Sequence, residues 1–309
     1  MIYICADDYG LCEISSMHIQ QCIDEGALNK VSVFPNFEKV DLHKLLNNKN
    51  IRISLHLNLV EGKCMADADE INLIADKNGD LKHTFGGLLK LNLFHGKKFG
   101  EQIYKEIKAQ VLFWKNILPP DIPFCIDSHQ HTHMIPAVFK AMVDVLKDEE
   151  INLEYMRIPV EPILAYIKKP SLYFSYSGIN IIKQWLLKFL WFINKRQAKR
   201  YKIPTAYFFG ILFSGQMDEK RVSKILPEYI KLAERSGKDI EVLFHPGYLN
   251  KNEIDLRNKN IVFNNFYLSE NRKTEFDSVM KISERSVLYC LILNGTKLMK
   301  EQEKNRSNY

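Results

Sequence analysis

The chain has 309 residues, of which 46% are hydrophobic and 26% are charged, and its formal net charge is +6 at pH 7. This composition excludes a disordered or fibrous chain and provides enough apolar residues for one large α/β domain or two smaller ones. The basic residues gather at 195–202 and after Lys297, away from the acidic and histidine-rich segments. That separation argues against nucleic acid as a partner.

The first residues of the chain and its cysteines indicate its compartment. The opening segment MIYICADDYG has neither the basic start nor the apolar stretch of a signal peptide. The six cysteines are scattered and form no CxxC pair, which favours reduced thiols over disulfides or cysteine-bound metal. We therefore expect a cytoplasmic protein.

Apolar runs alternate with helical patterns along the chain. Strands are expected near residues 2–6, 31–35, 51–59, 124–128, 154–158, 206–209 and 241–245. Helices are expected at about 14–25, 40–46, 100–117, 137–148, 179–200 and 219–236. Since no Pro/Gly/Ser-rich linker interrupts this alternation, we expect a single-domain (β/α) barrel-like fold over 1–290 with about seven parallel strands, in preference to a doubly wound open sheet. The polar segment 291–309 is expected to be a tail.

Unusual polar residues lie at or just after the C-terminal ends of the predicted strands. They are Asp7, Asp8, His56, the histidines of 129–133, Arg157 and His245. Active sites of parallel β/α proteins gather at this edge of the sheet, so these side chains should converge. Two adjacent carboxylates such as Asp7 and Asp8 repel each other unless a cation or a shared proton neutralises them, which together with the histidines indicates a metal site.

The segment IDSHQHTH at 126–133 carries three histidines at alternate positions. If the chain stays extended, His129, His131 and His133 point the same way, a pattern typical of metal or substrate contacts. Asp127 could orient one of the histidines from behind.

The other candidates have weaker individual signals. His56, in SLHLNL, faces inward, where a lone histidine is more often a hydrogen-bonded core residue than a ligand. His245, in FHPGY, fits either a plain turn or acid–base catalysis. Arg157, in RIP, could pair with a site carboxylate, grip a substrate or be an ordinary surface cation.

Taken together, the motifs ADDYG, LHLNLVEG, IDSHQHTHM, RIP and FHPGY resemble, in order and spacing, the YdjC-like carbohydrate deacetylases, a family that includes chitooligosaccharide and hopanoid-associated deacetylases. The resemblance runs from residue 1 to about residue 285. It implies a barrel-like fold and a hydrolase that removes the acetyl group from an N-acetylated mono- or oligosaccharide with one divalent metal ion, Mg²⁺ or Zn²⁺. The sugar is either free or lipid-linked.

The resemblance also implies residue roles. Asp8, His56 and His129 would be the metal ligands, Asp7 the base that activates the metal-bound water, and His245 the acid. His131, His133 and Arg157 are expected to contact substrate. Such a site leaves positions for water and for the acetyl oxygen, and a protonated imidazole helps a poor amine leaving group to depart.

Alternatives remain at two points. A metal-dependent phosphoesterase would use similar Asp and His ligands, although no second carboxylate cluster or glycine-rich phosphate loop is evident, and an inactive carbohydrate-binding protein of the same fold is the other alternative. The apolar and then basic segment 179–202 is expected to pack on the barrel or on a second copy in a homodimer. The alternative is peripheral contact with a membrane, because the apolar part is too short to span one.

Overall fold

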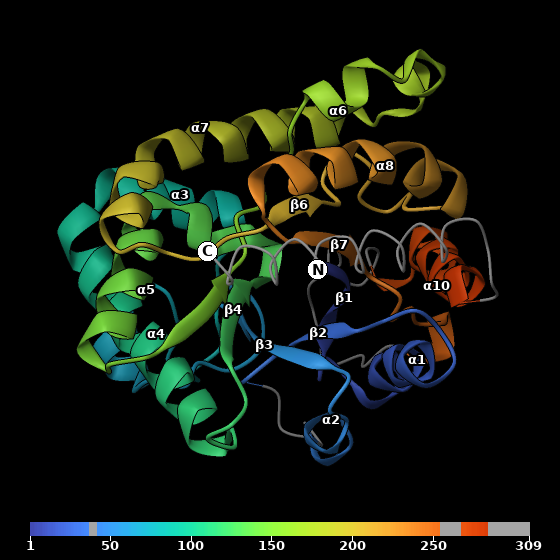
Figure 1. Ribbon diagram of the computed structural model, residues 1–309. Helices are drawn as coiled ribbons and strands as arrows, with labels where there is room; N and C mark the ends of the chain where they lie inside the picture. Colours follow the sequence, from blue (N-terminus) through green and yellow to red (C-terminus); the bar gives the residue numbers. More distant parts are fainter. Residues whose placement is uncertain (37–41, 254–266, 284–309) are drawn as a thin grey trace.

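One parallel sheet organises the molecule (Figure 1). The computed structural model describes residues 1–36, 42–253 and 267–283. The strands are β1 (Ile2–Tyr9), β2 (Lys30–Val33), β3 (Arg52–Leu57), β4 (Phe124–Ser128), β5 (Leu153–Met156), β6 (Tyr207–Phe209) and β7 (Ile240–Phe244). They lie in the order β5-β4-β3-β2-β1-β7-β6, and every neighbouring pair is parallel. The sheet is a half-barrel, which confirms the predicted α/β fold with seven parallel strands.

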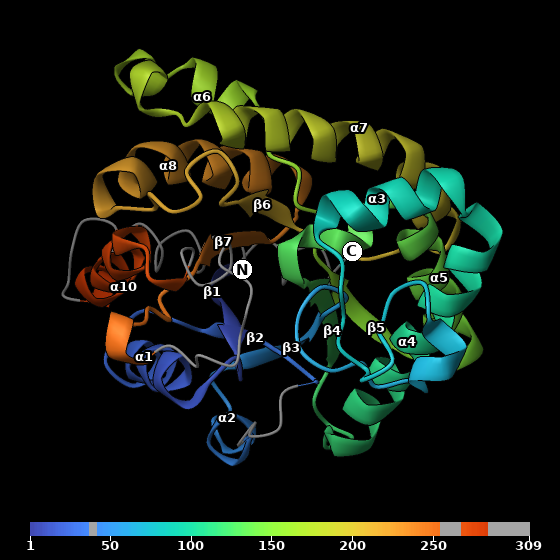
Figure 2. The ribbon, with the colours of Figure 1, turned by 180° about the vertical axis from the view of Figure 1, so that it is seen from behind.

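Helices flank the sheet, as the two opposite views show (Figures 1 and 2). They are α1 (Glu13–Asp24), α2 (His43–Asn47), α3 (Phe85–Phe94), α4 (Gly96–Ile117), α5 (Pro136–Asp148), α6 (Leu164–Ile167), α7 (Gly178–Arg200), α8 (Glu219–Ser236) and α10 (Glu270–Ser283). The 3₁₀ turns in the described part of the chain are η1 (Ala68–Ile71), η2 (His129–Met134), η3 (Pro170–Ser175) and η4 (Lys251–Glu253).

The predicted strands are all present, and the observed bounds differ from the expected ones by a few residues. The largest difference is β1, which runs three residues further than expected and therefore includes both Asp7 and Asp8. Part of the expected helix at 40–46 and all of the tail at 291–309 lie outside the described residues.

The hydrophobic core lies between the sheet and its helices. All eight residues of β1 are buried, as expected for a central strand covered on both faces. Helix α4 turns one apolar stripe inward, with Phe99, Ile103, Ile107 and Val111 completely buried four residues apart.

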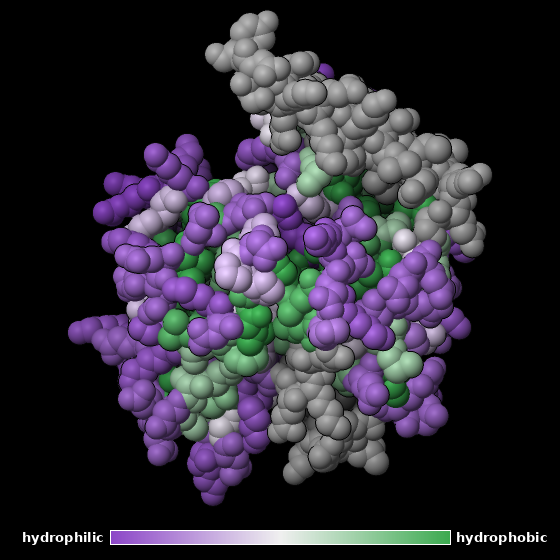
Figure 3. Space-filling view, turned by 60° about the horizontal axis from the view of Figure 1, so that its bottom comes forward, coloured by the Kyte–Doolittle hydropathy of each residue, from purple (hydrophilic) through white to green (hydrophobic). Residues whose placement is uncertain are grey.

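On the opposite side of the molecule from α7, hydrophilic side chains surround a smaller central group of hydrophobic ones (Figure 3).

The concave side of the half-barrel is polar. The Nζ atom of Lys30 lies 2.9 Å from Oε2 of Glu241, and both side chains are fully buried. Tyr155 donates its hydroxyl to the same carboxylate, and the Lys30 ammonium lies 3.9 Å from the centre of its ring. The two edges of the sheet approach each other, because the amide of Met156 at the end of β5 donates to the carbonyl of Pro204 before β6.

Two further observations concern compartment and membranes. Cys5, Cys12, Cys22, Cys64 and Cys125 are free thiols, and the sixth cysteine lies outside the described residues. In the described ranges, no helix combines the length and the apolar character that crossing a membrane requires.

Candidate metal centre and its surroundings

The end of β1 departs from regular strand geometry where the two aspartates lie. The pairing of β1 with β2 shifts register between Ala6 and Tyr9, and Asp8 has a left-handed backbone with φ of 70°. Successive side chains of a regular strand point to opposite faces, whereas here both carboxylates approach Nε2 of His56. Asp8 Oδ1 is 3.4 Å from that nitrogen and Asp7 Oδ2 is 4.0 Å from it.

Asp8, His56 and His129 form a buried group whose donor atoms all lie within 4.8 Å of one another. Nδ1 of His129 is 3.0 Å from Asp8 Oδ1. Asp8 Oδ1 and His56 Nε2 are fully buried and make no hydrogen bond. Buried polar atoms are almost always satisfied in native proteins, so two such atoms facing each other beside a second imidazole fit a divalent metal ion.

A second group, Asp7, His56 and Asp127, also has its donor atoms within 4.8 Å. Its two carboxylates are already occupied by Arg157, because Nη1 lies 2.6 Å from Asp7 Oδ2 and Nη2 lies 3.3 Å from Asp127 Oδ2. A metal ion there would have to compete with a buried guanidinium. In the group around Asp8, by contrast, the guanidinium of Arg272 contacts Oδ2 and leaves Oδ1 facing the imidazoles, so this group is the better metal site.

Each histidine of the metal group has a carboxylate on its far side. Asp127 Oδ1 lies 2.6 Å from His56 Nδ1, and Glu61 Oε1 lies 3.6 Å from His129 Nε2. Residues His56 and Asp127 are paired across β3 and β4, so the sheet itself sets the first of these contacts. Such carboxylates fix the orientation of metal-binding imidazoles and raise their basicity.

The local electrostatics favour charge on all three groups. Although burial opposes a charged imidazole, Asp7, Asp127 and Asp8 raise the pKa of His56 to about 10. Burial likewise opposes protonation of His129, and Asp8 and Glu61 outweigh it, so its pKa is raised. Burial alone would raise the pKa of Asp8, but Arg272 and the two imidazoles hold it well below the usual range.

Asp7 lies outside the metal group and is held by Arg157. Both guanidinium nitrogens contact its carboxylate, at 2.6 Å for Nη1 to Oδ2 and 2.8 Å for Nη2 to Oδ1. Nε of Arg157 donates to Glu241 at 2.7 Å, and the side chain is fully buried. Among the roles expected for Arg157, the structure shows the pairing with a site carboxylate.

The expectation that the three histidines of 129–133 point the same way is wrong. Instead of staying extended, the chain enters η2, in which Gln130 and His131 adopt left-handed backbone conformations with φ of 52° and 58°. The alternation of strand side chains is lost at that kink. His129 therefore turns to Asp8, while His131 and His133 diverge from it.

His133 and His131 are both buried, in different surroundings. The two ring nitrogens of His133 contact Ser128 Oγ at 2.5 Å and the carbonyl of Arg157 at 2.9 Å, and burial lowers its pKa to about 4. His131 packs edge-on against Phe208, and its Nδ1 is buried with no hydrogen-bond partner. Burial, with Lys183 and Arg157 nearby, lowers its pKa well below the usual range, so the ring is neutral.

His245 follows β7, the strand beside β1. Because Ala6 pairs with Phe244, His245 and Asp7 come next to each other directly after that pair. Nδ1 of His245 lies 3.4 Å from Oε2 of Glu275, and the side chain keeps 16% of its surface exposed. The same carboxylate accepts the backbone amide of His245 at 2.6 Å, so Glu275 fixes both the ring and the start of its loop.

Sequence reasoning missed several side chains around this centre. Arg272 of α10 contacts Asp8 Oδ2 at 2.5 Å and donates to the carbonyl of Gly247 at 2.9 Å. Tyr267 donates to Glu61. Burial lowers the pKa of Lys183 on α7, and the charges of Asp7 and Glu161 act in the opposite direction. The motif LHLNLVEG contains Glu61, but the segment around Arg272 has no strand-end signal.

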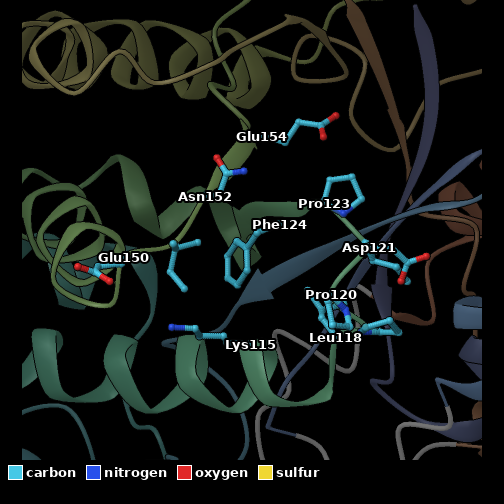
Figure 4. Close-up of a pocket in the computed structure, with 12 residues that line it drawn as sticks. Lys115, Leu118, Pro120, Asp121, Pro123, Phe124, Glu150, Asn152 and Glu154 are labelled. Atoms are coloured by element: carbon cyan, nitrogen blue, oxygen red, sulfur yellow. The ribbon is translucent and has the colours of Figure 1, made fainter.

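Two surface cavities lie at the N-terminal ends of the strands, opposite the edge that carries the metal group. One of about 370 Å³ surrounds Phe124, the first residue of β4, with Lys115, Pro123 and Glu154 on its walls (Figure 4). The other, of about 690 Å³, includes Met1, Asn29 and Arg52 before or at the start of β1, β2 and β3. Neither includes a histidine or a residue of the metal group.

Comparison with known proteins gives a consistent picture. The YdjC-like protein family model matches residues 1–288. A carbohydrate deacetylase of Danio rerio is 27% identical over 53% of this chain and 51% of its own length, and one of Xenopus laevis is 30% identical over 52% and 51%. The chain thus spans about half the length of these two curated relatives. The Mus musculus carbohydrate deacetylase is 24% identical over 80% of this chain and 78% of its own length.

A solved structure shares the fold. It is a protein of Enterococcus faecalis V583 described as a cellobiose-phosphate cleavage protein, with 15% identity, a TM-score of 0.63 and coverage of 95% of this chain and 94% of that one.

Proposed function

Because the chain belongs to the YdjC-like family, we propose that it is a metal-dependent hydrolase that removes the acetyl group from an N-acetylated sugar. The observation that carries this proposal is the arrangement of the two adjacent aspartates. Asp8 faces two buried imidazoles, whereas Asp7 is directed by Arg157 and approaches the same centre without belonging to the metal group. The names of the relatives, which are carbohydrate deacetylases, support the choice of substrate.

Asp8, His56 and His129 would hold the metal ion. One carboxylate and two imidazoles suit Zn²⁺, and Mg²⁺ is compatible if water completes its coordination. The ion would act as a Lewis acid that polarises the acetyl carbonyl and acidifies water. Asp127 and Glu61 keep the two imidazoles oriented for it.

Asp7 would act as the general base. Its carboxylate would accept a proton from the water molecule that attacks the amide carbon. The two hydrogen bonds from Arg157 restrict the carboxylate to one orientation, and a base held in one orientation needs no rearrangement before proton transfer. We therefore assign Arg157 to the positioning of Asp7 and not to contact with the sugar.

His245 would act as the general acid that protonates the leaving amine. It follows the strand next to β1, it is partly exposed, and Glu275 orients its ring. The neutral, buried His131 stays our candidate for a substrate contact. His133 uses both ring nitrogens within the protein, so we propose that it stabilises η2 and the end of β5.

We propose an N-acetylated mono- or oligosaccharide, free or lipid-linked, as the substrate, and the cytoplasm as the location. The location is supported by the five free cysteines, since thiols stay reduced in that compartment.

The test is acetate release from N-acetylated oligosaccharides by wild-type, metal-stripped and Asp7→Asn protein. Asp24→Asn, on the exposed end of α1, is the matched control. We expect acetate release to be lost on stripping, to return with Zn²⁺ or Mg²⁺, and to fall by a factor of at least about 100 in Asp7→Asn only. Undiminished release by Asp7→Asn would remove the base assignment. Metal binding without any acetate release would favour a carbohydrate-binding protein, and phosphate release from sugar phosphates would favour a phosphoesterase.

A further inference from the structure

Helix α7 presents several uncharged polar residues to the protein and many large apolar residues to the outside. Asn180, Gln184 and Asn194 are buried on its inner side. The amide of Asn194 donates to the carbonyl of Met134 at 2.7 Å, and Gln184 donates to the carbonyl of Glu161 at 3.0 Å. A surface helix of a globular protein normally does the opposite. Hydrogen bonds therefore hold α7 in place to an unusual extent, together with a few buried side chains such as Leu187 and Leu190.

The outer face of α7 is a stripe of large apolar side chains. Ile182 is 69% exposed, Trp185 57%, Phe189 62% and Phe192 65%. Their spacing of three and four residues places them on one side of the helix. Ile179 and Ile193 extend this stripe at 74% and 46% exposure. An exposed apolar surface of this kind marks an interaction site more often than a free surface.

The apolar stripe continues onto the segment before α7. Leu164 and Ile167 of α6 are 70% and 55% exposed, and Phe174 of η3 is fully exposed. In both views of the ribbon, α6 and α7 lie along the same outer edge of the molecule (Figures 1 and 2). The side chains of these elements can therefore reach one extended partner.

The charges carried by residues 162–217 all have one sign, and the nearby Glu228 of α8 pairs with Lys169 at 3.5 Å. Residues 162–217 contain no aspartate or glutamate. The basic residues of this range are Lys168, Lys169, Lys183, Lys188, Lys195, Arg196, Lys199, Arg200 and Lys202. Two of them pair with aromatic residues of the stripe: the Lys188 ammonium lies 5.1 Å from the Trp185 ring centre, and that of Lys195 lies 4.1 Å from the Phe192 ring centre. Lysine beside tryptophan or phenylalanine at the border of an apolar face is typical of a helix in the membrane interface.

We propose that the outer face of α7, with α6 and η3, docks on the surface of an anionic phospholipid bilayer. The helix would lie in the plane of the interface, with its apolar stripe among the acyl chains and its basic residues at the headgroups. Charge complementarity selects this occupant over a second copy of the chain. A symmetric pair of these faces would bring together two sets of cations with no acidic residue of 162–217 to compensate them.

This docking does not depend on the proposed chemistry, but it would affect how a sugar reaches the site. Asn194 of the same helix donates to the carbonyl of Met134 at 2.7 Å, and Met134 ends η2, the turn that begins with His129. A bilayer under α7 would thus lie beside the site region, where a lipid-linked sugar could enter.

The test is flotation of the full chain with vesicles of phosphatidylcholine alone or with 30% phosphatidylglycerol, at low and high salt. We expect binding to the anionic vesicles at least about tenfold stronger than to the neutral ones, because several basic residues of α7 would lie near the anionic surface. High salt should weaken it. Trp185→Ser/Phe189→Ser should reduce binding at least about tenfold, whereas Met17→Ser, which removes a residue 63% exposed on α1, should bind like wild type.

Circular dichroism checks that each variant is folded. If Trp185→Ser/Phe189→Ser does not fold, Arg196→Glu/Arg200→Glu on the exposed basic end of α7 tests the same proposal, and it should remove the preference for anionic vesicles. Absence of wild-type binding to anionic vesicles would overturn the proposal. A dimer in light scattering that Trp185→Ser/Phe189→Ser dissociates, without vesicle binding by wild type, would instead assign this face to a second copy.

Discussion

Arg157 and Asp7 form a bidentate ion pair in the buried interior of the half-barrel, with contacts of 2.6 and 2.8 Å. Two parallel hydrogen bonds from a planar guanidinium fix the plane of a carboxylate, whereas the compact ammonium of a lysine does not. The pair joins the end of β1 to the residue directly after β5, so an edge of the sheet controls the orientation of a side chain at its centre.

Arg157→Lys should separate the positioning of Asp7 from its charge. Lysine keeps the positive charge but not the bidentate geometry, so we expect kcat for acetate release to fall by a factor of about 10–100, with metal content unchanged. Steady-state kinetics with metal analysis checks this. Arg52→Lys is the matched control, because Arg52 pairs with Glu154 at the partly exposed start of β3. A rise in KM with unchanged kcat would instead indicate that Arg157 contacts the sugar.

His56→Gln should remove a metal ligand. We expect metal affinity to fall by a factor of at least about 100, because a neutral amide replaces an imidazole in a group of only three protein ligands. Metal content after dialysis against a graded chelator measures the change. His43→Gln, on the exposed first turn of α2, should keep the wild-type content. A full metal complement in His56→Gln would place the ion elsewhere.

Asp127→Asn should weaken metal binding indirectly, because Asp127 contacts the ligand His56 and not the ion. The residue contacts His56 Nδ1 at 2.6 Å and takes no part in the group around Asp8. Changes to such supporting carboxylates typically cost a factor of about 10–100 in metal affinity. We expect a loss within that range and smaller than the loss in His56→Gln, measured by the same chelator titration. Equal affinity in Asp127→Asn and wild type would show that the contact does not orient the ligand.

Glu241→Gln should destabilise the fold by about 3–5 kcal/mol, because it leaves the buried Lys30 ammonium without its carboxylate. Urea unfolding monitored by circular dichroism measures this. An exposed pair provides the control: Asp80→Asn, beside Lys63 at the surface, should unfold at nearly the same urea concentration as wild type.

The same carboxylate predicts a dependence of stability on pH. Burial alone would raise its pKa, but Arg157 and Lys30 outweigh it and lower the pKa of Glu241 to about 2. A glutamate in the unfolded chain has a pKa of about 4.3. Its contribution is therefore fully present above that value and is lost as pH falls towards 2. Urea unfolding of wild type between pH 6 and pH 3 should show this loss, and Glu241→Gln should show a weaker dependence.

Much of the fold was predictable because its signals are local. Each strand is a short apolar run, and in a parallel sheet the strand ends necessarily meet at one edge. That geometry placed the strand-end acids and histidines at one edge, and the family resemblance selected Asp8, His56 and His129 among them. Their donor atoms lie within 4.8 Å of one another.

The remainder depended on information that a local pattern does not carry. Alternation predicted parallel directions for His129, His131 and His133, but two left-handed residues redirect the chain. Arg272 reaches Asp8 from 264 positions away along the sequence, in a helix with no distinguishing motif. The sequence also left two orientations open for 179–202, packing on the barrel or a second copy and contact with a membrane, because an apolar stripe does not say whether it faces a core or the outside.

Because carboxylates surround the imidazoles of His56 and His129, protons and a metal ion would compete for the same ring nitrogens. Without a metal ion, the raised pKa values of the two rings mean that protons add positive charge to that which Arg157 and Arg272 already place beside the aspartates. A metal ligand must give up its proton. Loading the site would therefore release up to about two protons per ion, and the protein could keep these acids buried together before any metal arrives.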